Sequence, residues 1–339
     1  MTRPDSQSRA ERQSRMLKTA MGPAIAAALE DPAVVEILLN PDGHLWLDRR
    51  GEGRVMTGTA MTPADAERII RLVASHVQVE CHAEQPVVSA ELPESGERFE
   101  GLLPPVVTAP VFAIRKPAAQ IFTLDDYIAA GTLSPDFADI LRGAVWDRQN
   151  ILIAGGTSTG KTTLANALLA EIAATGDRVV IIEDTRELQC AAKDHVTLRT
   201  RPGIVSLADL VRSTLRLRPD RIVVGEVRGP EALAMLKAWN TGHPGGVTTL
   251  HANSALGALH RLEQLIQEAV VAVPRALIAE AIDLVVFIAG RDGARKVETI
   301  ARLEGGDADG YRLTPALASG SSTPPSPVTP SPSRSEGSS

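Results

Sequence analysis

The sequence predicts a mixed α/β protein that folds as two domains. Its 339 residues exceed the usual size of a single domain and suffice for two hydrophobic cores. In the second half, short apolar runs alternate with segments of helical spacing, which predicts a mostly parallel sheet covered by helices on both faces. A glycine-rich stretch directly after the apolar run 151–154 marks a strand-turn-helix unit there.

The first half is expected to form a smaller α+β domain over residues 16–117, behind a polar segment, 1–15, that we expect to be disordered. An alanine-rich helix is predicted at 23–30. Thr62 followed by Pro63 is typical of a helix start, and apolar residues recur at helical spacing after it. Strands are expected at 36–39, 45–47, 87–92, 99–103 and 111–114.

A linker with a short helix is expected over residues 118–134, and the second domain over residues 135–305. Ser134 and Pro135 open a helix that should run to about residue 148. The apolar strands of this domain are expected at 150–154, 178–183, 195–198, 221–225, 246–250 and 283–288. Residues 306–339 lose the apolar pattern and become rich in serine and proline, so we expect a disordered tail.

The composition argues against several classes of function. A formal net charge of −6 and 3% aromatic residues disfavour nucleic acid as the main partner. The two cysteines, Cys81 and Cys190, have no metal-binding spacing and fit a reducing compartment. No apolar run approaches the roughly 20 residues of a membrane span, and the N-terminus lacks the core of a signal peptide. We therefore expect a cytoplasmic protein that meets a membrane only peripherally, through partners.

The most informative stretch is residues 155–162, whose sequence GGTSTGKT matches the phosphate-binding loop G-x-x-x-x-G-K-[ST]. Its glycines let successive backbone N–H groups point at an anion, and the helix that starts near Lys161 adds its positive dipole end. Lys161 is expected to reach the β- and γ-phosphates, and the Thr162 hydroxyl to ligate Mg²⁺. The residues predicted to bind the nucleotide are Gly155, Gly156, Thr157, Ser158, Thr159, Gly160, Lys161, Thr162 and Thr163.

Two further strands end in carboxylates. The run 221–225 ends at Glu226, which is expected to polarise the attacking water or to hold hydrated Mg²⁺. Gly225 stands where many nucleotide hydrolases have an aspartate associated with Mg²⁺, so that carboxylate must come from elsewhere. The run 179–182 ends at Glu183 and Asp184, and in a parallel sheet both strand ends lie at the phosphate-binding edge.

The roles of these carboxylates remain open from the sequence. Glu183 and Asp184 are expected to complete the water shell of Mg²⁺ together with Thr162, or one of them to act as base. The sequence does not decide which of Glu183 and Glu226 acts as the base and which binds the metal. Glu187 is expected only to cap the turn or to pair with a neighbouring arginine.

Two histidines flank the predicted strand 246–250. His243 lies in a glycine-rich turn before it, and His251 lies directly after it. A neutral imidazole can report a γ-phosphate through a hydrogen bond and relay its loss. Both histidines are therefore expected to act as γ-phosphate sensors.

These motifs together resemble the secretion-type traffic ATPases. The segments GGTSTGKTT, IIEDTREL, RPDRIVVGEVRGPEA and TGHPGGVTTLHA follow the order of the Walker A motif, Asp box, Walker B motif and His box in that family. In the first half, EILLNPDGHLWLDR and FAIRKP resemble the conjugal-transfer branch, the TrbB-type ATPases of type IV secretion. The resemblance covers about residues 17 to 305. The paired CxxC motifs of many type II secretion members are missing from the sequence.

The resemblance implies a RecA-like P-loop NTPase domain, a PAS-like N-terminal domain, a nucleotide at their junction and a ring of six subunits. It also implies that Arg115 contacts the phosphates, with Arg98 as a second candidate. A guanidinium that reaches the γ-phosphate only when the domains close would couple hydrolysis to rigid-body movement. The sequence does not decide whether the other arginines contact a neighbouring subunit, bind the phosphates or form surface ion pairs. These are Arg212, Arg216, Arg218 and Arg228.

The function that follows is an ATP- and Mg²⁺-dependent hexameric motor of a conjugative type IV secretion system, bound to inner-membrane components of that system. The expected catalytic residues are Lys161, Glu226, Glu183, His251 and Arg115. A pilus-assembly or type II secretion ATPase is the nearest alternative. A RecA-type nucleic-acid translocase would need a basic groove or stacking aromatic residues. A non-hydrolysing nucleotide switch is disfavoured by the two carboxylate-bearing strand ends.

Overall fold

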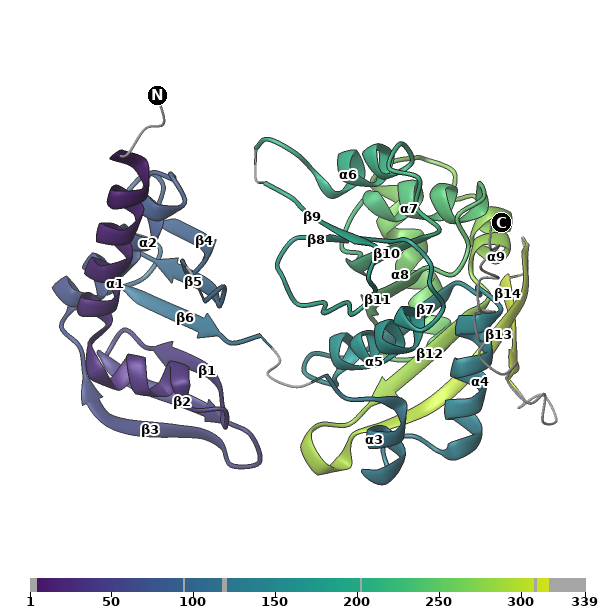
Figure 1. Ribbon diagram of the computed structural model, residues 1–339, viewed down its shortest axis with the longest axis horizontal. Coiled ribbons are helices and arrows are strands. Elements are labelled where there is room, and N and C mark those ends of the chain that lie inside the picture. Colours follow the sequence, from purple (N-terminus) through teal and green to yellow (C-terminus); the bar gives the residue numbers. More distant parts are fainter. Residues whose placement is uncertain (1–4, 94, 118–120, 202, 308–309, 317–339) are drawn as a thin grey trace, which may run out of the picture.

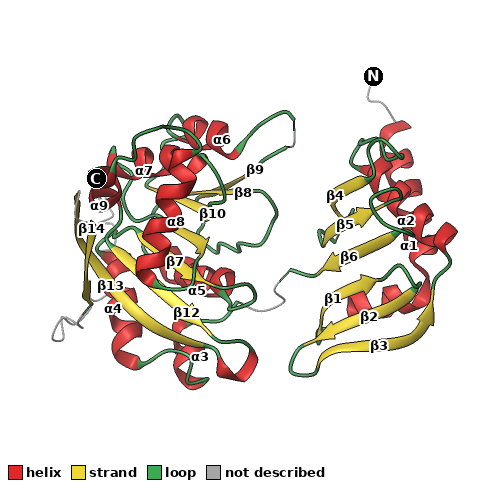
Figure 2. Cartoon of the chain, turned by 180° about the vertical axis from the view of Figure 1, so that it is seen from behind, coloured by secondary structure: helices red, strands yellow, loops and turns green. Residues whose placement is uncertain are grey.

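Two β-sheets organise the chain, and each carries its own helices and hydrophobic core (Figure 1). The structure is a computed structural model that describes residues 5–93, 95–117, 121–201, 203–307 and 310–316. Figure 2 shows the smaller sheet with α1 and α2 as one unit and the larger sheet with the remaining helices as the other.

The first domain is built on a six-stranded antiparallel sheet with the strand order β3-β2-β1-β6-β5-β4. Its strands are β1 (Val34–Leu39), β2 (His44–Arg49), β3 (Gly53–Ala60), β4 (Val87–Glu91), β5 (Arg98–Leu102) and β6 (Val111–Arg115). The helices α1 (Asp5–Glu30) and α2 (Pro63–His76) share a core with the sheet. Thr62 caps α2 and accepts a hydrogen bond from the N–H of Asp65, as its sequence position predicts.

Two parts of this domain differ from the sequence-based expectation. The segment 1–15 was expected to be disordered, but α1 begins at Asp5 and Ser14 is buried; residues 1–4 lie outside the described part. α1 consists of two helical segments that meet at Gly22. The strand β3 was not predicted, because most of its side chains face solvent and leave no apolar pattern.

The second domain is built on an eight-stranded sheet with the order β14-β13-β12-β7-β11-β10-β8-β9. The strands from β12 to β9 are parallel, and β13 and β14 are antiparallel. The strands are β7 (Ile151–Gly155), β8 (Val179–Glu183), β9 (His195–Arg199), β10 (Arg221–Glu226), β11 (Val247–His251), β12 (Leu284–Ala289), β13 (Lys296–Asp307) and β14 (Gly310–Pro315).

Helices cover both faces of this sheet, as the alternating pattern predicts. They are α3 (Leu124–Ala129), α4 (Pro135–Trp146), α5 (Lys161–Ala173), α6 (Leu207–Thr214), α7 (Glu231–Asn240), α8 (Ala255–Gln267), α9 (Arg275–Ala281) and the 3-10 turn η1 (Asp292–Ala294). On β7, Ile151 and Ile153 pack with α4 and α5, whereas Leu152 and Ala154 pack with α7 and α8. Strands buried on both faces read as unbroken apolar runs, which is why the sequence revealed them.

The expected tail over residues 306–339 differs from the structure in its first part. β13 continues to Asp307, and β14 then pairs with it from Gly310 to Pro315. Residues 317–339 lie outside the described part of the chain. Within the described ranges, none of the helices combines the length and the apolar character that crossing a bilayer requires.

Candidate active site

The phosphate-binding loop connects β7 to α5 and depends on two of its glycines. Gly160 precedes α5 with a φ of 93°, a conformation that residues with a side chain rarely adopt. A Cβ on Gly155 would lie 2.4 Å from the carbonyl oxygen of Ile288 on β12. The loop therefore needs glycine at one end for its backbone conformation and at the other for close strand contact.

Lys161 is folded back onto this loop. Its side chain is 7% exposed, and Nζ donates to the carbonyl oxygens of Gly155 at 3.1 Å and Gly156 at 2.8 Å. Nζ also lies 3.3 Å from Nδ1 of His251 on β11. Burial lowers the pKa of Lys161, and the charge of Glu226 opposes this change. Lys161 is thus a buried cation held by neutral groups at the centre of the loop.

The register of the parallel strands brings the predicted residues together. His251 pairs with Gly155 across β11 and β7, and Glu226 pairs with Thr249 across β10 and β11. β8 lies next to β10 and ends at Glu183. The carboxyl ends of these strands meet at one edge, as the sequence predicted, and Lys161, Glu183, Glu226 and His251 gather there.

Glu183 is the most buried carboxylate of this edge, at 3% exposure. Its Oε1 accepts hydrogen bonds from the backbone N–H groups of Glu187 at 2.9 Å and Leu188 at 2.7 Å. Its Oε2 is buried and has no hydrogen-bond partner among the described residues. Burial raises the pKa of Glu183 to about 7, against the two backbone hydrogen bonds, which lower it. Glu183 thus holds the following turn in place and keeps one oxygen available.

Gly225 explains how a buried carboxylate fits at this position. A Cβ on Gly225 would lie 3.1 Å from Cγ of Glu183 on the neighbouring strand. The absence of a side chain on β10 therefore makes room for the glutamate of β8. Position 225 thus has no aspartate, and the carboxylate of Glu183 enters this space from the adjacent strand β8.

Glu226 and His251 form a second charged group next to Lys161. Nε2 of His251 lies 3.0 Å from Oε1 of Glu226, and Arg228 donates to Oε2 of Glu226 at 2.5 Å. Burial lowers the pKa of His251, and the nearby charge of Lys161 lowers it further. A histidine with these neighbours favours the neutral form and connects the loop lysine to the end of β10.

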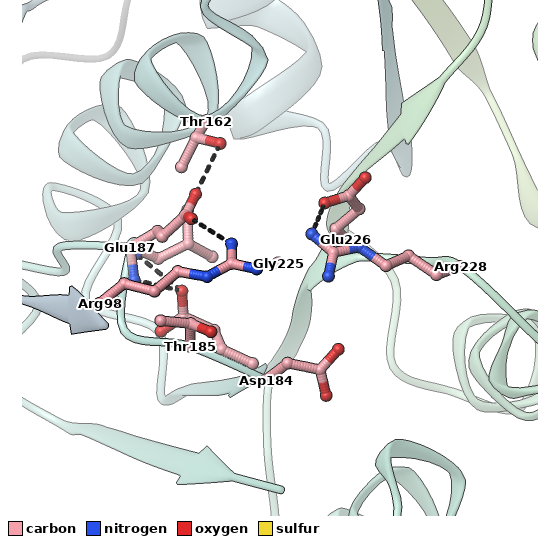
Figure 3. Close-up of a pocket in the computed structure, with 10 residues that line it drawn as sticks. Arg98, Thr162, Asp184, Thr185, Glu187, Gly225, Glu226 and Arg228 are labelled. Atoms are coloured by element: carbon pink, nitrogen blue, oxygen red, sulfur yellow. Dashed lines mark hydrogen bonds and ion pairs between the residues drawn. The ribbon is translucent and has the colours of Figure 1, made fainter. Parts of the chain in front are cut away.

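The turn after β8 reaches the first residues of α5 through Glu187. The Thr162 hydroxyl donates to Oε2 of Glu187 at 3.2 Å, and Arg98 lies 3.9 Å from the other oxygen of this carboxylate (Figure 3). Asp184 is exposed and accepts from the Thr200 hydroxyl at 2.8 Å. Glu187, which the sequence had suggested only as a cap or surface partner, is therefore the carboxylate that contacts the predicted metal ligand Thr162.

The first domain contributes a row of charged residues to this site. Arg98 on β5 pairs in register with Glu91 on β4 and with Arg115 on β6. Glu91 forms an ion pair with Arg199 on β9 and accepts from the N–H of Arg186 at 3.2 Å. The charge of Arg115 contributes to the lowered pKa of Lys161. Both predicted arginines of the first domain thus face the phosphate-binding edge.

One pocket contains most of these groups. Figure 3 shows Arg98 with Glu187 and Thr162 on one side of it and Arg228 with Glu226 on the other. The residues that line the pocket are Arg98, Thr162, Glu183, Asp184, Thr185, Glu187, Leu188, Gly225, Glu226 and Arg228. Among the arginines left open by the sequence, Arg228 is the one in this lining, and Arg212 pairs with Asp209 on α6.

His243 does not lie at this site. It precedes β11, whereas His251 ends that strand, so the two histidines lie at opposite edges of the sheet. Nδ1 of His243 is buried and has no hydrogen-bond partner among the described residues. The expectation that both histidines sense the γ-phosphate is therefore wrong for His243, because the strand between them separates their ends.

A further residue next to the loop had no signal in the sequence. The side chain of Arg295, which directly precedes β13, lies against Gly160, and its Nη2 donates to the carbonyl oxygen of Ser158 at 3.4 Å. Neither a motif nor a strand end marks Arg295. Only the pairing of β12 with β7 brings it to the loop.

The residues present fit a hydrated Mg²⁺ bound together with a nucleotide. The Thr162 hydroxyl, the Glu187 carboxylate and the unpaired Oε2 of Glu183 are oxygen donors at one end of the pocket. Within the described residues, no group of three or more His, Cys, Asp or Glu side chains forms a metal site by itself. This agrees with the preference of Mg²⁺ for a few protein oxygens supplemented by water and phosphate.

Known proteins with similar sequences point to one family. The family model described as "Type II/IV secretion system protein" matches residues 46–291. The conjugal transfer protein TrbB of Rhizobium radiobacter is 52% identical over 293 residues, which cover 86% of this chain and 90% of that protein. The type IV secretion system protein PtlH of Bordetella pertussis is 36% identical, over 79% of this chain and 89% of PtlH.

A solved structure shows the same fold. The pilus retraction motor PilT with bound ADP aligns with a TM-score of 0.61 and 22% identity, over 88% of this chain and 83% of that one. The site geometry, the family match and the relatives agree with the motifs found in the sequence. The chain belongs to the type II/IV secretion system protein family and is an ATPase that resembles the conjugal-transfer TrbB type.

Proposed function

We propose that this ATPase is the motor of a conjugative type IV secretion system. It acts as a homo-hexameric ring on the cytoplasmic side of the inner membrane, where it binds membrane components of that system. Similarity to conjugal transfer proteins over most of the chain supports this role. In this proposal the second domain is RecA-like and the six-stranded first domain is PAS-like.

ATP binds with its phosphates in the loop between β7 and α5. Lys161 is buried and charged, and among the described residues its ammonium group contacts two carbonyl oxygens and His251. A phosphate is a stronger partner for this cation than a carbonyl oxygen, because the hydrogen bond then joins two opposite charges. Lys161 therefore turns from the loop carbonyls to the β- and γ-phosphates when ATP binds.

Thr162, Glu187 and Glu183 hold hydrated Mg²⁺, with Asp184 near the outer rim of the pocket. When bound, the ion neutralises negative charge on the phosphates. Glu183 also fixes the turn that carries Glu187, through its two backbone hydrogen bonds. Asp184 is exposed and bonded to Thr200, so it acts at most through water.

Glu226 orients the water that attacks the γ-phosphate. It lies at the end of β10, beside His251 and Lys161, and its side chain is 20% exposed, whereas Glu183 is almost fully enclosed. His251 contacts both Glu226 and Lys161, so it can respond to the phosphate bound by the lysine. Arg115 approaches the same phosphates from the first domain, which couples hydrolysis to movement of that domain.

The observation that carries the proposal is the convergence of Lys161, Glu183, Glu226 and His251 at one sheet edge, faced by Arg98 and Arg115. The test is phosphate release by the purified chain with ATP and Mg²⁺, combined with electron microscopy in the presence of a nonhydrolysable ATP analogue. We expect hydrolysis and six-membered rings. A protein that stays monomeric with the analogue and leaves ATP intact would contradict the proposal.

The role of the first domain has its own test. Arg115→Ala should lower the ATPase rate about tenfold without preventing nucleotide binding, because a charge-assisted contact to the phosphates is lost. The control is Arg54→Ala, which removes an exposed arginine from β3 of the same domain. Equal rates in both variants and the unchanged protein would exclude a role for Arg115.

A further inference from the structure

The strand order divides the surroundings of the phosphate-binding loop into two sides. β7 lies between β11 and β12. On the side of β11 are His251, Glu226 and Glu183, the groups suited to the γ-phosphate. A nucleotide whose γ-phosphate points to these groups extends its nucleoside in the opposite direction, toward the end of β12. The residues after β12 are therefore the ones to examine for contact with the nucleoside.

The segment after β12 is a tight turn that fixes the position of Arg295. Gly290 has a φ of 76°, and a Cβ there would lie 2.1 Å from the carbonyl oxygen of Ala294. The turn η1 (Asp292–Ala294) follows, and β13 then pairs back onto β12. Because Gly290 allows this close approach, Arg295 is placed at the carboxyl end of β12 rather than out in solvent.

Arg295 lies flat against the loop. A Cβ built on Gly160 would be 3.0 Å from Nε and 3.1 Å from both Cδ and Cζ of Arg295. The contact of Nη2 with the Ser158 carbonyl oxygen, at 3.4 Å, fixes one end of the guanidinium. One face of this planar group is therefore covered by the loop backbone, which leaves the other face for a ligand.

Two polar atoms in this region have no hydrogen-bond partner among the described residues. They are the buried Nε of Arg295 and the buried hydroxyl of Tyr127 on α3. Burial raises the pKa of Tyr127 well above its usual value, and the charge of Arg295 opposes this. In addition, a cation at the N-terminal end of α5 is disfavoured by the helix dipole. A ligand with an electron-rich face over the guanidinium would offset the cost of placing this cation at the helix end.

We propose that Arg295 forms one wall of the nucleoside subsite and stacks on the base of the bound nucleotide. The inference deepens the proposed function and rests on ATP binding in the loop at Lys161. A guanidinium over a base makes a cation–π contact, which is stronger where the pair is shielded from water. Every base has a π face, so this contact binds a nucleoside without selecting one base strongly.

The test compares ADP with inorganic pyrophosphate, which lacks the nucleoside. Binding of each, with Mg²⁺, is measured by titration calorimetry on the full chain. Arg295→Ala should weaken ADP binding about tenfold, equivalent to 1.4 kcal/mol, and leave pyrophosphate binding unchanged. In steady-state assays the KM for ATP should rise about as much while kcat stays within about twofold. Arg291→Ala, in the same turn and exposed, is the matched control and should change neither.

The outcomes separate this inference from the proposed function. Unchanged ADP binding in Arg295→Ala, or an equal loss for ADP and pyrophosphate, would overturn the stacking role. Lys161→Ala should weaken the binding of both ligands. If it weakens neither, the proposed nucleotide site itself fails.

If Arg295→Ala does not fold, as judged by its thermal melt, Arg295→Gln is used, since a glutamine keeps a donor for Ser158 but lacks the cation. Its ADP binding should weaken, and unchanged binding would likewise overturn the proposal.

Discussion

The two edges of the central parallel sheet both carry buried charged groups, but these groups are partnered differently. At the amino edge, Arg221 is 1% exposed and donates to Asp177, to the Gly245 carbonyl oxygen and to the Val145 carbonyl oxygen. At the carboxyl edge, Lys161 has neutral partners, and Glu183 keeps a buried oxygen that is unpaired within the described residues. The comparison teaches that the buried arginine with complete hydrogen bonds stabilises the fold, whereas the buried lysine and glutamate with unmet bonding capacity, gathered at one strand end beside a pocket, mark a binding site.

The largest expected effect is the loss of ATPase activity in Lys161→Ala. Removing the only cation that the loop itself supplies should lower the hydrolysis rate by about three orders of magnitude, because charge on the phosphates loses its nearest stabilising partner. The melting temperature should fall little, since the partners of the lysine within the described part of the chain are two carbonyl oxygens and the His251 ring. Phosphate release and thermal unfolding check this, with the exposed Lys237→Ala on α7 as control. Near-normal turnover would show that the carboxyl edge is not the catalytic one.

The opposite result is expected for Arg221→Ala at the amino edge. It leaves the buried Asp177 with Arg148 and the Thr175 hydroxyl as partners and should lower the free energy of unfolding by about 3 to 5 kcal/mol. Any activity that the folded fraction retains should have an unchanged KM for ATP. Urea denaturation measures the stability, and Arg212→Ala, which removes an exposed arginine from α6, should leave it within error. A stable variant with a raised KM would break the distinction between the two edges.

A third comparison separates the two glutamates of the carboxyl edge. Glu226→Gln should lower kcat about 100-fold, because an amide orients and polarises the attacking water poorly. Glu183→Gln keeps an oxygen that can accept from Glu187 and Leu188, so its kcat should fall less than about fivefold. Steady-state rates at saturating ATP decide between them. The reverse ranking would assign the water-orienting role to Glu183.

The smallest effect concerns the pH dependence of stability. The pKa of Glu183 is about 7 in the folded chain against a reference value of 4.5, so its protonated form favours folding. The corresponding stability is fully present below about pH 4.5 and is lost as the pH rises through 7. It amounts to roughly 3 kcal/mol at most, at 1.36 kcal/mol per pKa unit. Glu183→Gln should therefore become more stable relative to the unchanged chain between pH 5 and 8, as measured by urea denaturation. A difference that is independent of pH would show that Glu183 ionises normally.

The sequence predicted the strands of the second domain well, because strands covered on both faces are unbroken apolar runs. It missed β3, whose residues are mostly exposed, and β13 and β14, in which exposed and half-buried residues interrupt the apolar pattern. The N-terminal segment was expected to be disordered because its residues are polar, yet it belongs to α1. Periodicity therefore reveals buried elements and overlooks those with solvent-facing side chains.

For the site, the sequence predicted the residues that directly follow apolar strands. Glu183, Glu226 and His251 are of this kind, Lys161 was found through the glycine-rich motif, and the parallel sheet brings all four together. The sequence predicted only a capping or pairing role for Glu187. The position of Glu187 depends on its backbone hydrogen bond to the buried Glu183, and this contact cannot be read from the sequence. His243 was placed wrongly because both ends of one strand were treated as equivalent. Arg295 lacks any motif and is brought to the loop only by the strand order.

The in-register pairing of Arg98 with Arg115 has a mechanical consequence. Because β5 and β6 are joined along their whole length, a tilt of the first domain carries both guanidinium groups at once. In the proposed motor, closure of the first domain would therefore deliver two positive charges to the phosphates together, and its opening would withdraw them together.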